Sequence, residues 1–354
     1  MTAISDVARL AGVSKSTASR ALTGRGYVSE ETRRRVVEAA AEIGYIASPN
    51  AASLVTGRTK NVGVVIPFIN RWFFGEVLEG IERTLLASGY DLTLYNLALS
   101  GPERDRVFDF FLARKRVDAV IAVGVDLSDA EAELVERRGK PIIALGGTAG
   151  SAPRLAIDDR GAARLATEHL IDLGHTRIAH LAGAGAGSAA RSVQAFRRAG
   201  FLDAMREAGL DPVGGEDGIV EAEMTLPGGY DAGLQLLGHP ATRPTAIFAA
   251  SDEIAFGVMR AAERLGLAVP GTLSVIGFDG HEHAELFGLT TIEQLPGAQG
   301  RFAVDAVLRL LGEPTGDDDP LTPDGLPDFD RPLDTRLVVR GSTTAPSGRV
   351  LAAR

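Results

Sequence analysis

The stretch at residues 6–22, with the sequence DVARLAGVSKSTASRAL, constrains the fold of this chain more than any other. Its apolar residues recur at helical spacing on both sides of Gly12, and a glycine permits the positive φ of a tight turn between two helices. Ser14 is a favourable N-cap for the second helix. The residues expected on the inward side of that helix are Thr17, Ala18, Ala21 and Leu22. Its other face then carries small hydroxyl and basic side chains.

A third helix is predicted to follow this pair. Ser29 is a good N-cap, and Glu30 and Glu31 suit the positive end of the helix dipole. The helix is expected to end at Gly44, and the side chains expected to face inward are Val36, Val37, Ala40 and Ile43. Two short helices joined by a glycine turn and supported by a third describe a helix-turn-helix unit.

The charge of the chain is unevenly distributed. Residues 1–60 contain nine Lys and Arg against five Asp and Glu, a balance of +4, although the whole chain carries a net charge of -9. The remaining residues therefore carry -13. A basic head on an acidic body suggests that only the head approaches a polyanion. Because a balance of +4 over 60 residues is modest, chance is the alternative explanation on charge alone.

The composition excludes several classes of protein. At 354 residues with 45% hydrophobic side chains, the chain is long enough for two or three compact units. It has no cysteine, which excludes disulfides and thiolate metal sites and fits a reducing compartment. No apolar run reaches the length of a membrane span, and the start does not have the pattern of a secretory signal. These features predict a cytoplasmic protein without a membrane partner.

From residue 61 onward, short apolar runs alternate with longer amphipathic stretches. The predicted strands are residues 62–66, 92–95, 119–123, 142–145, 178–182, 246–249 and 274–278. The amphipathic stretches, which are predicted helices, include residues 76–87, 104–115, 162–173, 193–208 and 254–265. Alternation of this kind predicts parallel sheets with helices on both faces, and the length exceeds that of one such sheet. The expected fold is therefore an all-α helix-turn-helix head followed by an α/β core of two lobes, each built on a doubly wound parallel sheet.

The second helix of the head offers a polar face small enough to enter a major groove. Lys15 and Ser16, at its N-terminal end, are positioned to reach base edges. The residues expected to contact phosphates and set the register are Ser14, Thr17, Arg20 and Tyr27. A helical hairpin with no role in DNA binding shows the same pattern of apolar stripes around a glycine, so this alternative stays open on the pattern alone.

The segments DVARLAGVSKSTASRAL and YVSEETRRRV, with the GY at residues 44–45, resemble the DNA-binding head of the lactose/galactose repressor family, the LacI-type regulators. Segments such as IDDRGAARLATEHLIDLGHTRIAHLAG and LTTIEQ extend the resemblance over about residues 2–344. The resemblance implies a recognition helix that carries Lys15, Ser16 and Arg20. It also implies a hinge that folds on operator DNA, whose matching residue, Leu54, wedges into the minor groove; such a wedge bends the duplex at a cost offset by new contacts.

The resemblance also predicts the domain organisation. It implies a core similar to periplasmic sugar-binding proteins, with two lobes joined by three crossovers. The expected segments are a helix-turn-helix domain at 1–46, a hinge helix or linker at 47–60, an effector-binding and dimerisation core at 61–344, and a tail at 345–354. Lobe 1 is expected to comprise about 61–158 and 293–318, and lobe 2 about 159–292 and 333–344. A loop rich in Asp, Pro and Gly at 312–332 is expected to be an exposed insertion.

Several polar and aromatic side chains follow predicted strands, where ligands of such sheets bind. The candidate effector-binding residues are Arg71, Trp72, Phe73, Asp158, Arg197, Ser251, Asp252 and Asp279. Carboxylates and guanidinium groups form paired hydrogen bonds with vicinal hydroxyls, and an aromatic ring covers the apolar face of a sugar. Arg197, in an Arg-x-x-Gly-aromatic motif, and Asp279 match positions of the family. For each candidate, a role as a helix cap or salt-bridge partner is the alternative.

The chain departs from the family pattern at the first strand of the body. Phe68 stands in PFINRWFF where many members carry an aspartate, and the cation of Arg71 lies nearby. Gly280 also replaces a second aspartate. The loss of carboxylates makes an anionic effector, such as a sugar phosphate or sugar acid, an alternative to a neutral sugar. The sequence does not decide between the two.

No motif in the sequence supplies a catalytic group or a cofactor site. The segment LAGAGAGSAA has Ser188 where a dinucleotide-binding loop needs its third glycine. His281 and His283 are a possible metal pair, but a loop pair with no third ligand is usually a surface feature, so we expect neither a metal nor a cofactor.

The features together predict a regulator and not an enzyme. The expected protein is a repressor of a carbohydrate operon that binds double-stranded operator DNA as a homodimer under the control of a small-molecule effector. A sugar-binding receptor without gene control is the alternative. Whether the effector releases the DNA or acts as a co-repressor stays open.

Overall fold

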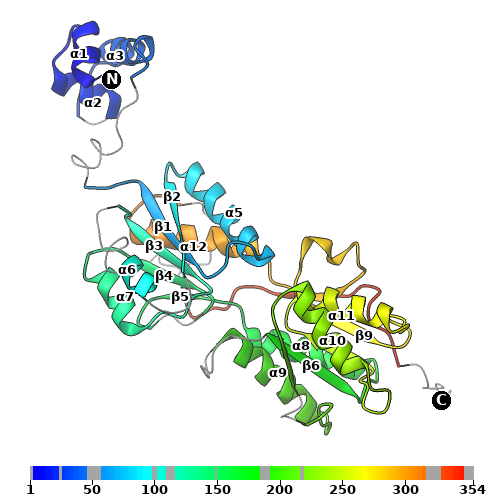
Figure 1. The fold of residues 1–354 in the computed structure, drawn as a ribbon. Coiled ribbons are helices and arrows are strands. Elements are labelled where there is room, and N and C mark those ends of the chain that lie inside the picture. Colours follow the sequence, from blue (N-terminus) through cyan, green and yellow to red (C-terminus); the bar gives the residue numbers. More distant parts are fainter. Residues whose placement is uncertain are drawn as a thin grey trace. The chain divides into compact units, whose positions relative to one another are not determined.

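The structure is a computed structural model of the chain (Figure 1). It describes residues 3–23, 26–45, 57–97, 102–108, 116–147, 150–183, 192–215, 219–315 and 328–346. The chain forms two compact units, one of residues 1–61 with 114–118 and one of residues 62–113 with 119–354. In the described ranges, no helix is both long and apolar enough to cross a membrane.

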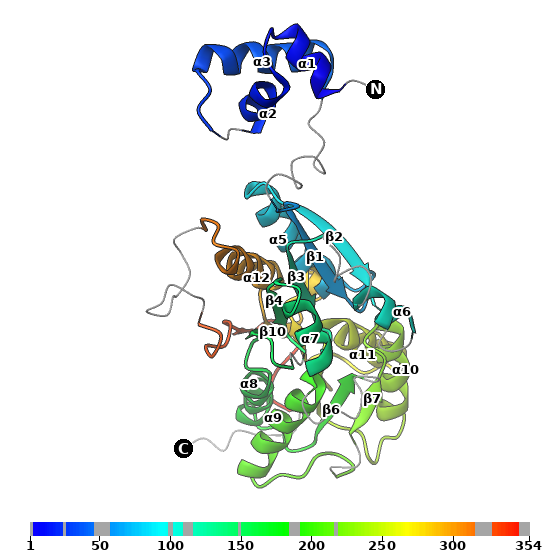
Figure 2. The same ribbon diagram turned by 90° about the vertical axis from the view of Figure 1, so that its left-hand side faces the viewer.

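The first unit contains the three-helix head that the sequence predicts (Figures 1 and 2). Its helices are α1 (Ile4–Leu10), α2 (Lys15–Thr23) and α3 (Glu30–Glu42). Gly12 adopts a φ of 65° in the turn between α1 and α2, a conformation that favours glycine. Ser14 accepts a hydrogen bond from the Thr17 N–H at 3.1 Å, and Ser29 accepts one from the Thr32 N–H at 3.3 Å. Both predicted caps are confirmed.

The core of the head is small and rich in alanine. Its buried residues are Val7, Ala8, Ala11, Ala18, Ala21, Val36, Ala39 and Ala40. The prediction that Val37 faces inward is wrong, because its side chain is 50% exposed. Adjacent residues on a helix point about 100° apart, so the burial of Val36 and Ala40 turns Val37 toward solvent.

The first lobe of the core is built on a five-stranded sheet with the order β2-β1-β3-β4-β5. The strands are β1 (Asn61–Ile66), β2 (Asp91–Asn96), β3 (Ala119–Val123), β4 (Ile142–Leu145) and β5 (Arg154–Leu155). The pairs β1–β3, β3–β4 and β4–β5 are parallel. The apolar strands β3 and β4 are buried along their whole length, as expected for a parallel sheet covered on both faces.

Helices from two distant parts of the chain complete the first lobe. They are α5 (Trp72–Ala87), α6 (Pro102–Arg106), α7 (Asp129–Glu136) and α12 (Pro296–Leu310). Although α12 is far from α5 in the sequence, the two helices pack against each other (Figure 1).

The second lobe is built on a six-stranded sheet with the order β11-β10-β9-β8-β6-β7. The strands are β6 (Ile178–Gly183), β7 (Val220–Ala222), β8 (Ala246–Ala249), β9 (Ser274–Asp279), β10 (Thr290–Glu293) and β11 (Arg336–Val338). Neighbouring strands are parallel, except that β11 is antiparallel to β10. The helices are α8 (Asp159–Asp172), α9 (Val193–Glu207), α10 (Leu226–Leu237), α11 (Asp252–Arg264) and the short η3 (Glu282–Ala284).

Successive residues of β8 pack into different clusters on the two faces of this sheet. Phe248 lies in the cluster that contains Phe201 of α9, whereas Ile247 lies in the cluster that contains Val258 of α11. Because successive side chains of a strand point to opposite faces, the pairs α8–α9 and α10–α11 cover opposite faces. This arrangement confirms the doubly wound sheet that the sequence predicts.

The described chain passes between the two sheets at three places. The first follows β5, the second follows β10, and the third lies between α12 and β11. A parallel bridge between Ile157 and Leu333 joins the first and third passages. The two-lobed architecture implied by the resemblance is therefore present.

Several helix and strand predictions need correction. Helices α5, α8 and α11 begin two to four residues before their predicted starts, because their caps lie further upstream at residues 71, 158 and 251. Of the helix predicted at 104–115, the structure contains α6, and residues 109–115 lie outside the described residues. The sequence did not predict β5, β7, β10, β11, α7, α10 or α12. The middle of the loop at 312–332 also lies outside the described residues.

Candidate functional site

The exposed face of α2 carries the predicted DNA-reading residues. Lys15, Ser16 and Arg20 are exposed, and Thr17 is half-buried. The hydroxyl oxygen of Ser14 lies 2.9 Å from the hydroxyls of both Ser16 and Thr17. The three hydroxyls therefore cluster at the N-terminal end of α2, where the helix dipole favours an anion such as a phosphate.

Other contacts hold this face in place and leave one aromatic ring free of the core. Arg33 of α3 donates a hydrogen bond to the carbonyl of Ala21 at 3.1 Å, which ties α3 to α2. Tyr27 is 94% exposed, so its ring contributes nothing to the core of the head.

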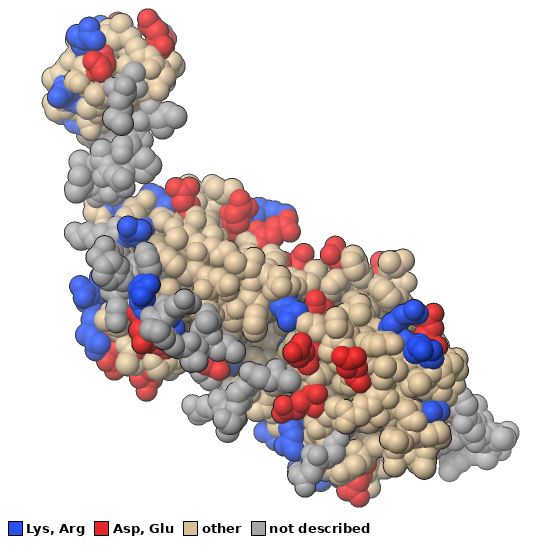
Figure 3. All heavy atoms as spheres, viewed as in Figure 1, with Lys and Arg blue, Asp and Glu red and all other residues tan. Residues whose placement is uncertain are grey.

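On the face shown in Figure 3, the head carries acidic side chains beside basic ones and has no continuous basic surface. Leu54 and residues 47–56 of the hinge predicted at 47–60 lie outside the described residues.

Arg197 is the centre of the candidate effector site in the second lobe. It lies on α9 and is only 4% exposed. Its Nε donates to Asp159 at 2.9 Å and its Nη1 donates to the carbonyl of Ala250, just after β8, at 2.6 Å. Its guanidinium carbon lies 3.6 Å from the centre of the Phe278 ring, a cation–π contact. The predicted Arg197 therefore lies among the carboxyl ends of β8 and β9, with its charge compensated.

Asp279, the last residue of β9, faces the same guanidinium. One of its oxygens lies 3.8 Å from Nη1 of Arg197 and accepts a hydrogen bond from Gln294 at 2.6 Å. Burial raises the pKa of Asp279 to about 7, although Arg197 and Gln294 counteract the shift. Gln299 of α12 in turn donates to the carbonyl of Gln294 at 2.6 Å. A buried polar network therefore runs from Arg197 through the second passage between the lobes to α12.

Ser251 and Asp252 have structural partners at the start of α11. Ser251 caps the helix, since its hydroxyl accepts from the Ile254 N–H at 3.2 Å. Asp252 is fully buried and accepts from the Thr291 hydroxyl at 2.6 Å and from the His281 N–H at 2.7 Å. Burial raises the pKa of Asp252 well above its ordinary value, and the negative charge of Asp279 adds to the shift. Asp252 therefore stabilises the loop that follows β9 through its hydrogen bond with His281.

The residues at the start of α5, in the first lobe, contact the loop that follows β9 in the second lobe. The ring of Trp72 stacks on that of His281, with centroids 4.4 Å apart and an angle of 25° between the planes. The indole N–H of Trp72 is buried and has no hydrogen-bond acceptor among the described residues. Arg71 lies close enough to Glu253 to lower its pKa, although burial raises that pKa more strongly. Phe73 packs against the core of the first lobe.

Asp158 lies apart from this group. It is exposed and caps α8 by accepting from the Gly161 N–H at 2.9 Å. It lines an open groove of about 340 Å³ whose other residues are Arg160, Gly161, Arg164, Asp203 and Glu207. The carboxylate that meets Arg197 belongs to its neighbour, Asp159, which is 4% exposed.

Asp159 and Gln294 were not among the predicted site residues, and His281 was considered only as part of a metal pair. A cap consumes the side chain of the residue before a helix, so the second carboxylate of the IDDRG segment is the one available for other contacts, and this signal was present. Gln294 follows β10, which was not predicted as a strand, and His281 lies in a loop without a pattern. Neither residue could be placed by the rule on strand ends.

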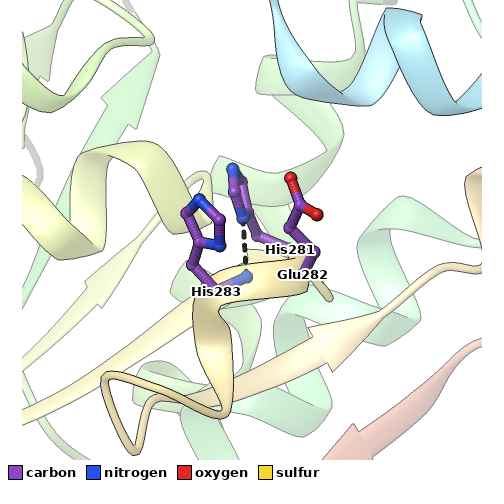
Figure 4. A group of neighbouring side chains, drawn as sticks. All are labelled: His281, Glu282 and His283. Carbon is purple, nitrogen blue, oxygen red and sulfur yellow. Dashed lines mark hydrogen bonds between the residues drawn. The ribbon is translucent and has the colours of Figure 1, made fainter.

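His281, Glu282 and His283 place ligand atoms within 4.8 Å of one another (Figure 4). The Nδ1 of His281, however, accepts a hydrogen bond from the His283 N–H at 3.0 Å, so the proton of its neutral ring is on Nε2. A metal-bound imidazole instead donates through its second nitrogen. Burial, and then the neighbouring His283, lower the pKa of His281 to about 4. The arrangement does not fit a metal site and suits a neutral ring stacked on Trp72.

Comparison with known proteins identifies both parts of the chain. Residues 3–49 match the model for bacterial regulatory proteins of the lacI family, and residues 167–343 match the model for a periplasmic binding protein-like domain. The chain is 33% identical over 321 residues to the HTH-type transcriptional repressor PurR of Vibrio vulnificus, with 88% of this chain and 92% of that protein covered. It is 34% identical over 320 residues to the ribose operon repressor of Escherichia coli K12, with 89% and 94% covered.

Solved structures show the same architecture. The Lac repressor dimer bound to operator and the anti-inducer ONPF matches with a TM-score of 0.81 at 28% identity, and the match covers 97% of this chain and 99% of that one. A LacI family regulator from Enterococcus faecium with bound ribose matches with a TM-score of 0.66 at 26% identity over 80% of this chain and 99% of that one. The protein is therefore a member of the LacI family, a DNA-binding transcriptional regulator with a helix-turn-helix head and a two-lobed periplasmic-binding-protein-like core.

Proposed function

We propose that the protein is a repressor of a carbohydrate operon, which acts in the cytoplasm as a homodimer on a near-palindromic operator. An effector that it binds without transforming it sets the operator affinity. The observation that carries this proposal is the buried cluster of Arg197, Asp159 and Asp279 at the strand ends, in a chain whose α2 exposes Lys15 and Ser16. The similarity to the ribose operon repressor, which aligns over most of the chain, supports a carbohydrate effector.

The charges at the candidate site favour a neutral effector over an anionic one. Arg197 already faces Asp159 and Asp279, and Arg71 faces Glu253. Burial, with repulsion from Glu79 and then Glu282, raises the pKa of Glu76, so carboxylates also approach one another across the two lobes. An effector that carries a phosphate or carboxylate would add negative charge where cations are already compensated. Neutral hydroxyl groups avoid this cost and can donate to the carboxylates.

Trp72 supplies a complementary donor. Its buried N–H lacks an acceptor among the described residues, and an oxygen of the effector would satisfy it. Because Trp72 is the only tryptophan of the chain, fluorescence excited selectively at tryptophan reports this position alone. An effector that binds beside Trp72 should therefore change the emission of the protein.

Exposed apolar side chains support the dimer. Leu286 is 82% and Phe287 44% exposed, and the Phe287 ring lies 4.6 Å from that of Phe256 on α11. Exposed apolar residues that continue a core cluster are typical of an interface. The solved Lac repressor that matches this chain is a dimer. Sedimentation equilibrium measures the state directly, and we expect the mass of two chains.

The test of the proposal is selection of operators from a library of random near-palindromic duplexes, followed by fluorescence anisotropy with and without neutral sugars. We expect a selected duplex to bind more tightly than a scrambled one, a steep inverse dependence of log affinity on log salt, and a change in affinity with at least one sugar. A protein that binds sugars yet prefers no duplex would instead be a receptor without gene control.

The replacement Leu54→Ala should lower specific operator affinity by about tenfold, because an apolar wedge offsets the cost of bending the duplex. Effector binding, measured by Trp72 fluorescence, should be unchanged. Anisotropy with the selected operator and a scrambled duplex checks this expectation. If the ratio of the affinities for the selected operator and the scrambled duplex were unchanged, this would count against a minor-groove wedge at Leu54.

Effector affinity should rise with pH around neutrality. Asp279 has a pKa raised to about 7, so its ionised fraction grows between pH 6 and pH 8. Because hydroxyl donors bind a carboxylate more strongly than a carboxylic acid, an effector held by Asp279 should bind about tenfold more tightly at pH 8 than at pH 6. Titrations followed by Trp72 fluorescence measure this, since His281, with a pKa of about 4, stays neutral in this range. In the Asp279→Asn variant, effector affinity should not depend on pH between 6 and 8. A pH dependence that persists in this variant would remove Asp279 from the site.

A further inference from the structure

A single carboxylate holds the end of the linker where it enters the core. Asp118, directly before β3, accepts hydrogen bonds from the Thr59 N–H at 2.8 and 3.0 Å, from the Thr59 hydroxyl at 2.9 Å and from the Lys60 N–H at 2.8 Å. The Asp118 N–H donates to the carbonyl of Asn61 at 2.7 Å, and the Asn61 amide donates to the carbonyl of Arg116 at 3.0 Å. Residues 59–61 and 116–118 form what we name the linker clasp.

The clasp holds a backbone bend that does not persist without support. Lys60 has a φ of 53°, in the left-handed region that favours glycine. A non-glycine residue in such a conformation is strained and persists only where its surroundings determine it. Asp118 binds the N–H groups of Thr59 and Lys60, which belong to the two successive peptides that lead into the bend. Hydrogen bonds to an ionised acceptor are among the stronger ones, so the clasp sets the direction of the chain at this point.

Two strands lead from the clasp to the candidate effector site. Asn61 begins β1 and Asp118 precedes β3, and these strands pair in parallel from Val62 and Ala119 onward. At their other ends, β1 leads to the segment that carries Trp72, and Gly124 follows β3. A Cβ on Gly124 would lie 2.8 Å from the ring of Phe74, so the end of β3 packs tightly against α5. The clasp and the start of α5 are therefore connected by the paired strands β1 and β3.

We propose that Asp118 is a positioning residue for operator binding. It holds residues 59–60 in the orientation that specific DNA binding requires, and through β1 and β3 it makes that orientation respond to the effector. The proposal rests on the proposed function. It concerns a residue that is remote from both ligands and acts through the linker.

The variant Asp118→Asn tests the proposal in the full-length protein. The amide keeps the shape of the side chain but turns a donor toward the N–H groups of Thr59 or Lys60, so the clasp loses two or more of its bonds. We expect an operator affinity lower by on the order of tenfold, the equivalent of 1.4 kcal/mol, with binding to a scrambled duplex unchanged. Effector affinity, from Trp72 fluorescence, should be unchanged, while the ratio of operator affinities with and without effector should move toward one.

Two further variants sharpen the test. Asp91→Asn alters an exposed carboxylate at the start of β2 in the same sheet and should leave every measurement unchanged. Thr59→Val removes only the hydroxyl bond to Asp118 and should lower operator affinity about two- to threefold, which decides the matter if Asp118→Asn does not fold.

The outcomes separate the proposal from its alternatives. If both clasp variants keep the operator affinity and the effector response of the wild type, the proposal is wrong. It is also wrong if operator and effector affinity fall together, because Asp118 then only stabilises the first lobe. A wild-type protein that selects no duplex would overturn the proposed function instead, since the variants are compared with the operator that the wild type selects.

Discussion

Arg197→Ala should abolish the response to effector and destabilise the core by about 3–5 kcal/mol, the usual cost of removing one partner from a buried ion pair. Arg197 is 4% exposed and compensates two carboxylates, those of Asp159 and Asp279. Burial already raises the pKa of Asp159, and Arg197 is the main influence that lowers it. Without the guanidinium, both carboxylates lose their cation and the effector loses the site that they form.

Three measurements check this expectation. Thermal unfolding should show the loss of stability, Trp72 fluorescence should not change on addition of effector, and operator affinity should be kept at a low temperature where the variant is folded. Arg206→Ala is the matched control, because Arg206 lies on the same helix and forms an exposed ion pair with Asp203 at 3.4 Å. Exposed pairs contribute little, so this variant should be close to the wild type. A folded Arg197→Ala protein that responds normally would remove Arg197 from the effector site.

Several strands that the sequence predicted correctly have a continuous apolar run. β3 and β4 are buried on both faces, and such strands need only apolar side chains, which a single sequence displays. The strands that were missed are short or lie at an edge. β5 has two residues and β7 and β11 have three, which leaves too little pattern to detect. β10 has four residues, as do the correctly predicted β4 and β8, but its sequence TTIE lacks their apolar run.

The missed helix α10 has a different cause. Its sequence LPGGYDAGLQLL contains three glycines, which lower helix propensity. The structure explains them by packing: a Cβ on Gly229 would lie 2.3 Å from the carbonyl oxygen of Ile254 on α11. A Cβ on Gly257 of α11 would lie 2.2 Å from that of Leu226. The two helices approach so closely that tertiary contact outweighs local propensity, and a single sequence does not contain that contact.

The candidate site was predictable to the level of strand ends but not of single residues. The rule that ligands bind at carboxyl ends of strands pointed to Asp279, which is the last residue of β9 and lies 3.8 Å from Arg197. It did not separate Asp158, which caps α8 in solvent, from Asp159, which is buried against Arg197. Adjacent residues at the start of a helix point in different directions. The position of α9, which carries Arg197, therefore determines which of the two carboxylates contacts the guanidinium.

Two replacements on α2 should weaken DNA binding in different ways. Lys15→Ala should lower operator affinity by roughly 1–3 kcal/mol, about 5- to 150-fold, because a side chain that reads a base edge carries discrimination of that size. The loss should be largest for duplexes with the preferred base pair. Arg20→Ala should weaken selected and scrambled duplexes alike and reduce the slope of log affinity against log salt by about one, as expected for a phosphate contact.

Lys15 and Arg20 are both exposed and neither belongs to the buried core of the head, so their replacement should affect DNA binding without affecting the fold. Arg20 donates to the Ser16 carbonyl at 3.2 Å, a bond within α2 that an exposed helix can lose with little effect on its fold. Circular dichroism of each variant therefore serves as the control for the fold. The expected result is a changed base preference with an unchanged salt slope for Lys15→Ala, and the reverse for Arg20→Ala. The reverse result would mean that Arg20 contacts the bases and Lys15 contacts the DNA backbone. In that case α2 would lie in the groove rotated about its own axis, compared with the orientation in which Lys15 faces the bases.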